Sequence, residues 1–252
     1  MAEIKECVLL TRPLGENELL ASKLANSGWD VLVRPMLKIE ALLPRTRLLS
    51  NLTIFDKIIF VSKNSVRHGL PLMNYGSLES SHHNIWLAIG RGTATELQKH
   101  GVSAKFPIKS DTESLLELEE LKRPRLHRIL IIRGEGGRDL LEKTLIQRGA
   151  KVSLCEVYRR IALNYSDLDT MPLGSVLTSN SLGALESLLS NLPNSRKDFN
   201  LVVPSKRIAT IATKFSFGSV TNSEGASNDK LYEAIMSLKS SCDGDEENDL
   251  KQ

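Results

Sequence analysis

The chain has little of several features that would identify a function directly. It has 3 cysteines in 252 residues, Cys7, Cys155 and Cys242, and no CxxC pair, so neither a disulfide framework nor a zinc site of cysteines is indicated. Its formal net charge is only +3, with basic residues spread among acidic ones, which argues against a nucleic-acid-binding protein. We expect the cysteines to be packing residues.

Long hydrophobic runs are also missing. The strongest apolar segments, such as Ile58–Val61 and Ile129–Ile132, fall far short of the roughly 20 residues that a membrane helix needs. The first residues carry mixed charge and lack the apolar centre of a signal peptide. We therefore expect a cytoplasmic protein that does not enter a membrane.

The common catalytic motifs are absent from the sequence. Neither GxxxxGK[ST] nor GxGxxG occurs, which disfavours a nucleotide site and, with the missing P-loop lysine, phosphoryl transfer. GxSxG and HExxH are absent too, and the five histidines, including His82 and His83, lack metal-ligand spacing. We expect no metal, and either an enzyme that works by holding a flexible substrate in one shape or a binding module.

What the chain does contain is a repeat. A strand-like run through Arg12 and the helical stretch after it reappear 121 residues later around Arg133, and the segment around Ser62 reappears 117 residues later around Ser179. Two copies of one plan predict two similar lobes, and paired lobes usually leave a cleft between them. The repeat alone leaves open which copies share a lobe.

Short β-rich runs alternate with amphipathic segments along the chain, which is typical of βα units and a parallel sheet. The class is therefore α/β. Strands are expected near Cys7–Thr11, Asp30–Arg34, Lys57–Val61, Trp86–Ile89, Arg128–Ile132, Lys151–Tyr158, Ser175–Thr178 and Leu201–Val203. Helices are expected over Glu16–Asn26, Asn64–Leu70, Gly92–His100, Glu113–Leu121, Arg138–Arg148, Ser181–Leu189, Lys206–Lys214 and Lys230–Lys239.

Small hydroxyl or glycine residues follow several expected strands. They occupy four junctions at helix starts, Phe60–Ser65, Ile89–Thr93, Leu177–Ser181 and Val203–Arg207. Unpaired backbone N–H groups at a helix start can hold a carboxylate or phosphate, although the same residues also serve as ordinary helix caps. The glycine-rich loop Arg133–Arg138 is open to the same two interpretations, a strand-to-helix turn or an anion site, and Arg138 is its most interesting residue.

Five motifs in chain order give the sequence a resemblance. They are Thr11–Pro13, Ser110–Leu116, Arg133–Arg138, Glu156–Arg160 and Val202–Arg207. The ordered set resembles the uroporphyrinogen-III synthase family of the bacterial type, over residues 1 to about 238. Each motif alone is weak, and the order makes the set specific.

The resemblance implies an interleaved assembly of two flavodoxin-like parallel-sheet lobes. One lobe would combine residues 1–37 with 160–240, and the other would span 38–159. Two extended crossings, near Arg34–Ala41 and Cys155–Ala162, would form a two-stranded hinge beside a cleft between the lobes. Residues 241–252 are an acidic tail with little to bury, which we expect to be mobile.

The resemblance also implies a reaction. Members of the family are lyases that close hydroxymethylbilane, a linear tetrapyrrole octacarboxylate, into uroporphyrinogen III with loss of water and inversion of ring D, without a cofactor. We expect a monomer, although the sequence does not determine the oligomeric state, and a transient contact with the preceding pathway enzyme is left open. The residues themselves leave one alternative, a non-catalytic two-lobe module that senses an anionic ligand.

Site residues follow from the same resemblance. Tyr158 matches the family tyrosine proposed to assist departure of the hydroxyl, and its alternative is an aromatic ring packed in the hinge. The implied substrate-binding residues are Arg12, Ser62, Asn64, Thr93, Arg138, Ser179 and Ser205. Where many members have a glycine and two threonines, this chain has Val203–Lys206, which weakens a hydroxyl-specific role for Ser205.

Overall fold

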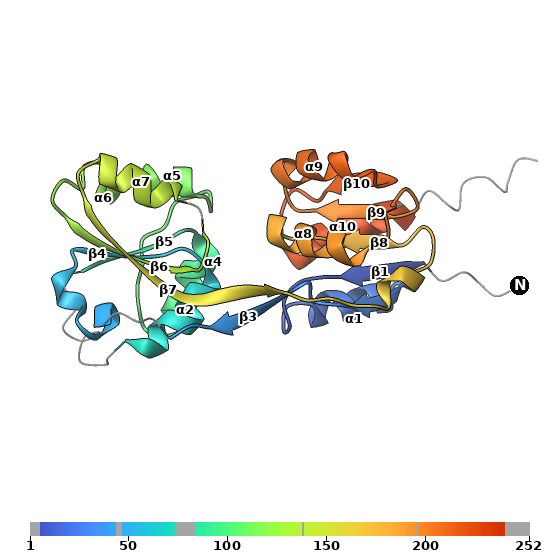
Figure 1. Ribbon diagram of the computed structural model, residues 1–252, viewed down its shortest axis with the longest axis horizontal. Coiled ribbons are helices and arrows are strands. Elements are labelled where there is room, and N and C mark those ends of the chain that lie inside the picture. The colour runs from blue at the N-terminus through green and yellow to red at the C-terminus, as the bar shows by residue number, and fades with distance from the viewer. Residues whose placement is uncertain (1–5, 44–46, 74–83, 138, 195, 240–252) are drawn as a thin grey trace, which may run out of the picture. The chain divides into compact units, whose positions relative to one another are not determined.

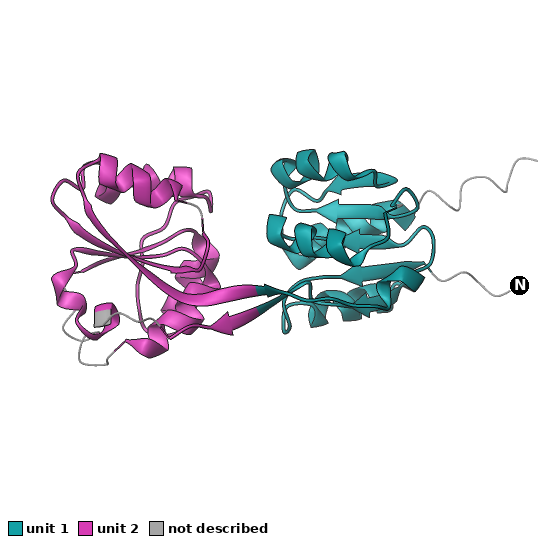
Figure 2. Ribbon diagram, viewed as in Figure 1, with its two compact units in different colours: residues 1–38, 161–252 teal, residues 39–160 magenta. Residues whose placement is uncertain are grey.

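The computed structural model describes residues 6–43, 47–73, 84–137, 139–194 and 196–239, which form two compact units (Figure 2). Unit 1 combines residues 1–38 with 161–252, and unit 2 is the continuous stretch 39–160. Each unit holds a mainly parallel sheet packed with helices, so the predicted α/β class is confirmed. The acidic tail lies outside the described residues, as do Cys242, His82, His83 and Arg138.

Unit 1 is built on a parallel sheet whose order, among the described residues, is β10-β9-β8-β1-β2 (Figure 1). Numbered along the chain within the unit, this is the 2-1-3-4-5 order of flavodoxin-like sheets. The strands are β1 (Cys7–Leu10), β2 (Asp30–Val33), β8 (Val176–Thr178), β9 (Asn200–Val203) and β10 (Ser219–Asn222). The helices are α1 (Glu18–Ala25), α8 (Leu182–Asn191), α9 (Lys206–Ala212) and α10 (Asn228–Lys239), with 3₁₀ turns at Leu168–Thr170 and Thr213–Phe215.

Both faces of this sheet are covered. Successive strand residues point to opposite faces, and Leu9 and Leu177 join one buried cluster while Val8 and Val176 join another. A sheet buried on both sides needs apolar residues at every position, which explains why these strands read as continuous hydrophobic runs.

Unit 2 repeats the plan. Its described order is β3-β7-β6-β4-β5, so its own strands β4, β5, β6 and β7 again follow the arrangement 2-1-3-4. The strands are β3 (Leu37–Ala41), β4 (Lys57–Phe60), β5 (Ile85–Ala88), β6 (Arg128–Gly134) and β7 (Lys151–Ala162). The helices are α2 (Lys63–Gly69), α4 (Arg91–Gln98), α5 (Thr112–Leu116), α6 (Glu119–Lys122) and α7 (Leu140–Gln147), with 3₁₀ turns at Arg47–Ser50, Leu52–Ile54 and Leu70–Leu72.

The repeated segments are exchanged between the units. The segment β1-α1-β2 shares unit 1 with β8-α8-β9, whereas β4-α2-β5 shares unit 2 with β6-α7-β7. The question that the repeat left open is thus answered, and the interleaved arrangement implied by the resemblance is confirmed.

The chain passes between the units within β3 and at the end of β7. Leu42 N donates to Val157 O at 2.9 Å, and Leu163 N donates to Met36 O at 3.0 Å. Residue numbers rise on one strand as they fall on the other, so β3 runs antiparallel to β7. It occupies the edge position that β10 holds in unit 1.

Two expectations about elements need correction. The strand β10 was not predicted, because Ser219–Asn222 has only one apolar residue and lies half-buried at a sheet edge. The single helix expected over Glu113–Leu121 is two short helices, since Leu118 between them has an extended backbone with ψ of 139°. Among the described residues, none of the helices has the length and apolar character of a membrane span.

Two glycines at the start of α4 give a test of the packing in unit 2. A Cβ on Gly90 would lie 2.0 Å from Ser110 Oγ and 2.8 Å from Ser110 Cα, whereas one on Gly92 would meet only the flexible end of Lys63 at 3.0 Å. We predict that Gly90→Ala lowers the free energy of unfolding by about 1–3 kcal/mol. Gly92→Ala, the matched control, should leave it unchanged or raise it by up to about 1 kcal/mol. Urea denaturation followed by circular dichroism measures both, and equal midpoints would contradict the close approach of Ser110.

Candidate active site

The edge where parallel strands end is the place to look for ligand contacts in both units. In doubly wound sheets, ligands bind beyond the carboxyl ends of the strands, at the point where the strand order reverses. That point lies between β4 and β6 in unit 2 and between β1 and β8 in unit 1. In unit 2, Ser62 lies just after β4 and Gly134 is the last residue of β6. In unit 1, Thr11 follows β1 and Ser179 follows β8.

Tyr158 lies at this edge in unit 2 because of a glycine opposite it. Gly134 pairs with Tyr158 just after a shift in the register of β6 and β7. A Cβ on Gly134 would stand 2.5 Å from Tyr158 Cζ and 2.9 Å from its Oη, so only glycine allows the ring to lie there. The side chain is 1% exposed and packs against the hydrophobic cluster of unit 2.

The phenol hydroxyl has two polar neighbours. Tyr158 Oη lies 3.1 Å from Ser62 Oγ and accepts a hydrogen bond from Arg160 Nη2 at 2.8 Å. The guanidinium carbon of Arg160 also lies 5.1 Å from the centre of the ring, and the ring of His68 lies 5.9 Å away on the helix α2. The hydroxyl is therefore at the carboxyl edge of the sheet within a bonded cluster, although the ring is buried.

Ser62 is fixed by its place at the start of α2. Its Oγ accepts from Ser65 N at 2.9 Å, and Ser65 Oγ accepts from Ser62 N at 3.0 Å, which forms a capping box. The serine that begins the helix is thus also the serine that meets the phenol. Asn64 lies half-buried in the first turn of the same helix.

The start of α4 presents different residues from those predicted. Thr93 is only 4% exposed, and its N–H donates to Gly90 O at 3.1 Å. Arg91 and Gly92 are exposed instead, with the stem of Lys63 lying beside Gly92. The cations at this edge therefore come from residues that the sequence interpretation passed over.

Arg133 is a further residue that sequence reasoning missed. It is the next-to-last residue of β6 and is 5% exposed. Its Nε donates to Gly134 O at 3.3 Å and lies 3.9 Å from Glu156 Oε1. A Cβ on Gly137 would stand 2.6 Å from Arg133 Nη2, so the glycine loop closes directly over this guanidinium. Arg138, the residue predicted in this loop, lies outside the described residues.

In unit 1 the corresponding edge is tied together by two threonines. Thr11 Oγ1 donates to Thr178 O at 2.7 Å, and Thr178 Oγ1 donates to Leu9 O at 3.0 Å. Both threonines are 1% exposed. Their hydroxyl groups join the ends of β1 and β8 and serve the fold.

Ser179, the predicted residue that follows β8, is buried. Ser179 is 0% exposed and its hydroxyl donates to Ser181 O at 3.3 Å, so its side chain is not at the surface. Ser181 caps α8 by accepting from Ala184 N at 3.1 Å, and it is the structural counterpart of Ser62. The sequence repeat matched Ser62 with Ser179, but the residue that caps the helix in unit 1 comes two positions later. Between these serines, Asn180 Oδ1 is buried without a hydrogen-bond partner among the described residues.

Arg12, predicted to bind substrate, is used by the fold. It is 8% exposed; Nη1 donates to Asn228 Oδ1 at 2.5 Å, and Nη2 donates to Ala226 O. Burial lowers the pKa of this guanidinium, and the nearby carboxylate of Glu16 opposes that effect. Its charge therefore fixes the start of α10 to the end of β1.

Ser205 is half-buried and caps α9, accepting from Ile208 N at a long 3.4 Å. The preceding Pro204 has no N–H to offer a ligand. This junction therefore presents little beyond the serine hydroxyl and the first amides of the helix.

The two described cysteines are unsuited to nucleophilic chemistry. Burial raises the pKa of Cys155 to about 11, and burial also raises the pKa of Cys7. Both thiols are therefore protonated at neutral pH, which agrees with a packing role. Among the described residues, His, Cys, Asp and Glu side chains form no group of three that could hold a metal ion.

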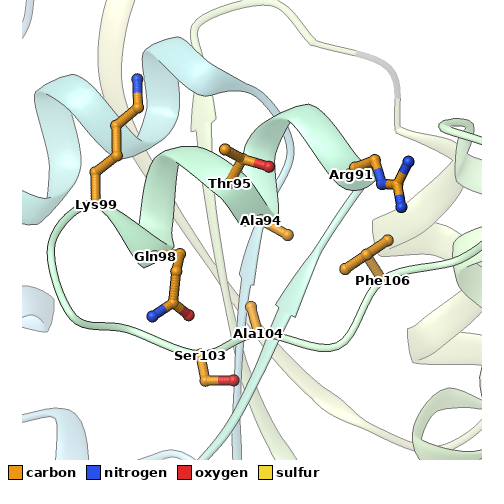
Figure 3. Close-up of a pocket in the computed structure, with 8 residues that line it drawn as sticks. All are labelled: Arg91, Ala94, Thr95, Gln98, Lys99, Ser103, Ala104 and Phe106. Atoms are coloured by element: carbon orange, nitrogen blue, oxygen red, sulfur yellow. The ribbon is translucent and has the colours of Figure 1, made fainter.

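A shallow hollow of about 440 Å³ lies on unit 2, and Arg91 at the start of α4 is among its lining residues (Figure 3). It runs along α4 and the segment that follows, and Arg91 and Phe106 lie together near one end of the helix. Its lining residues are Arg91, Ala94, Thr95, Gln98, Lys99, Ser103, Ala104 and Phe106, which include none of the predicted site residues.

Comparison with known proteins gives a consistent result. The family model described as "Uroporphyrinogen-III synthase HemD" matches residues 18–233. The chain is 31% identical to uroporphyrinogen-III synthase of Salmonella typhimurium over 246 residues, covering 91% of this chain and 99% of that protein. It is 29% identical to the enzyme of Escherichia coli K12 over 248 residues, with the same coverage of 91% and 99%.

Solved structures agree at the level of the fold. The uroporphyrinogen-III synthetase of Helicobacter pylori superposes with a TM-score of 0.68 at 16% identity, covering 93% of this chain and all of that one (100%). A mutant synthase from Thermus thermophilus gives a TM-score of 0.62 at 15% identity, covering 93% and 98%. Because the family model and the bacterial relatives span most of its length, the chain belongs to the uroporphyrinogen-III synthase family.

Proposed function

We propose that this chain is an active lyase that closes hydroxymethylbilane to uroporphyrinogen III, with inversion of ring D and loss of water. Family membership supports the activity. The observation that carries the chemistry is the phenol of Tyr158, held at the carboxyl edge of unit 2 by Ser62 and Arg160. The predicted cytoplasmic location, monomeric state and transient contact with the preceding enzyme stay predictions.

The reaction begins when the terminal hydroxyl of the bilane leaves as water. Tyr158 donates the proton that this departure needs, and an electrophilic, positively charged azafulvenium group remains. The substituted carbon of ring D attacks it to give a spiro intermediate, which fragments and recombines with the ring inverted. The proton released when the ring system regains aromaticity balances the one that the phenol gave up.

The chemistry requires little beyond a proton donor and a fixed substrate shape. The reacting carbons belong to one molecule, so holding the two ends of the bilane in one arrangement selects which carbon of ring D attacks. The steps are proton transfers, the breaking of one carbon–oxygen bond and changes of carbon–carbon bonds, with no net oxidation or reduction, so no redox cofactor is needed. This fits the proposal of a cofactor-free enzyme and explains why the sequence carries no catalytic triad.

The eight carboxylates of the substrate explain why cations and hydroxyl groups lie at the carboxyl edges of the two sheets. In unit 2, Lys63 and Arg91 are exposed cations, and Arg133 lies under the glycine loop. We propose that these cations, with Ser62 and Asn64 at the start of α2, bind acetate and propionate groups. In unit 1, Ser181 and Ser205 are the corresponding hydroxyl groups at helix starts.

Product analysis tests the function directly. We predict that the purified chain converts hydroxymethylbilane mainly to the type III isomer, whereas buffer or heat-denatured protein gives type I. The isomers are separated by chromatography after oxidation to porphyrins. A chain that binds the bilane and leaves only type I product would be the non-catalytic sensor instead.

Replacing the phenol separates chemistry from packing. We predict that Tyr158→Phe lowers kcat roughly 5- to 150-fold, because one transition-state hydrogen bond worth about 1–3 kcal/mol is lost. Product affinity should stay near the wild-type value because the ring still packs against Gly134. Tyr158→Ala should also lower the melting temperature. Wild-type turnover by Tyr158→Phe at every pH would assign the residue to packing alone.

Arg12 and Lys63 should behave in opposite ways. We predict that Arg12→Met lowers the free energy of unfolding by about 1–3 kcal/mol, because Asn228 Oδ1 and Ala226 O lose their donor, with little change in KM. Lys63→Met should raise KM and change stability by less than about 0.5 kcal/mol, since the residue is exposed. Denaturation measures the free energy of unfolding of both variants, and steady-state kinetics measures their KM. A stable Arg12→Met with a raised KM would return Arg12 to substrate binding.

A further inference from the structure

We infer that Arg160 is a positioning residue for the reaction, and that Arg160 and Ser62 together direct the proton of Tyr158 toward the departing hydroxyl. The inference rests on the proposed function and assigns a role to a side chain outside the predicted site. It is carried by the bonds around one oxygen atom, Tyr158 Oη.

The direction of the first bond is fixed by chemistry. A guanidinium has only donors, so in the 2.8 Å contact Arg160 Nη2 donates and Tyr158 Oη accepts. The phenol proton therefore cannot point at Arg160. It points either to Ser62 Oγ, at 3.1 Å, or away from both neighbours.

The helix cap limits what Ser62 can do with its own proton. Ser62 Oγ already accepts from Ser65 N at 2.9 Å, and the hydroxyl of Ser65 is engaged with the backbone of Ser62, donating to its carbonyl oxygen at 2.6 Å. The hydroxyl proton of Ser62 is available to donate to Tyr158 Oη. In that arrangement Oη accepts twice, and its own proton is directed away from the protein donors, where the leaving hydroxyl must lie.

The same two donors stabilise what remains after proton transfer. The bond from Tyr158 Oη to its proton breaks, the proton joins the departing hydroxyl as water, and a phenolate is left on a side chain that is 1% exposed. A buried anion is costly unless it is paired and hydrogen-bonded. Arg160 supplies a positive charge and a charge-assisted bond, and Ser62 supplies a second donor.

Strand geometry explains why Arg160 reaches Tyr158 Oη and the adjacent Arg159 does not. Residues two apart on a strand share a face, so Tyr158 and Arg160 lie on one side of β7. Arg159 points to the other side, where its Nε donates to Glu40 Oε2 at 2.7 Å. Arg159 is therefore a matched control with the same charge at the adjacent position.

The test is a double-mutant cycle on the full chain. We expect Arg160→Gln to lower kcat about 10- to 100-fold with little change in KM, as expected for loss of a hydrogen bond to a charged group. Arg160→Lys should recover part of the loss, and Arg159→Gln should match the wild type. In the Tyr158→Phe background, Arg160→Gln should cost nothing more, because its target oxygen is gone.

A spectroscopic arm keeps the contact testable without turnover. In protein labelled at tyrosine ¹³Cζ, the Tyr158 signal is assigned by its absence in Tyr158→Phe. It should shift in Arg160→Gln and stay in place in Arg159→Gln. Melting temperatures near the wild-type value confirm that the variants are folded.

Each outcome has one meaning. Losses in kcat that multiply in the double variant, or an unshifted ¹³Cζ signal, overturn the inference. A rise in KM alone assigns Arg160 to binding a substrate carboxylate and overturns it too. If the wild type makes only type I isomer while the ¹³Cζ shift appears, the proposed function has failed and the contact between Arg160 and Tyr158 still stands.

Discussion

The close approach of the Tyr158 ring to the backbone of Gly134 is the constraint on which the candidate site depends. Any side chain at position 134 would occupy the volume of the ring, and the phenol would be displaced from the edge of the sheet. Because the ring lies there, its hydroxyl reaches the serine that caps α2, and a residue two positions along the strand reaches the same oxygen. A missing Cβ on one strand thus determines which helix and which arginine can take part in the chemistry.

The two units show how one plan is used in two ways. Both have the same strand order and place small polar residues at the same edge. In unit 1 that edge is closed by the threonine pair Thr11 and Thr178, and its arginine, Arg12, is bound to the loop before α10. In unit 2 the equivalent edge holds the buried phenol of Tyr158 and the exposed cations Lys63 and Arg91. The same scaffold occurs twice, and the side chains at the switch point distinguish a structural edge from the proposed reactive one.

The fold could be predicted well because the strands and the two units each follow from patterns of neighbouring residues in the sequence. Continuous apolar runs indicated the strands that are buried on both faces, and the repeat indicated the two units. The strand β10 was not predicted, because three of its four residues are polar and such an edge strand lacks a continuous apolar run. The site was harder. Ser62 and Tyr158 were named, but their contact joins residues 96 positions apart and required the register of β6 and β7. Ser179 and Arg12 were named from motif position, which cannot show that one is buried and the other already bonded. Arg160 was within reach, since Tyr158 and Arg160 both lie in the extended crossing Cys155–Ala162 that the resemblance implied, and residues two apart on an extended segment share a face.

The path of the chain has a consequence for how the protein is made. Unit 2 is one continuous stretch whose ends are joined by the pairing of β3 with β7, so it can complete its sheet while the ribosome is still synthesising the remainder. Unit 1 cannot, because β1 must wait for β8, and Thr11 and Thr178 are separated by 167 positions. The first strands of the chain therefore spend most of translation without a partner for one edge. A nascent chain should therefore emerge with unit 2 folded first and its N-terminal strands still exposed.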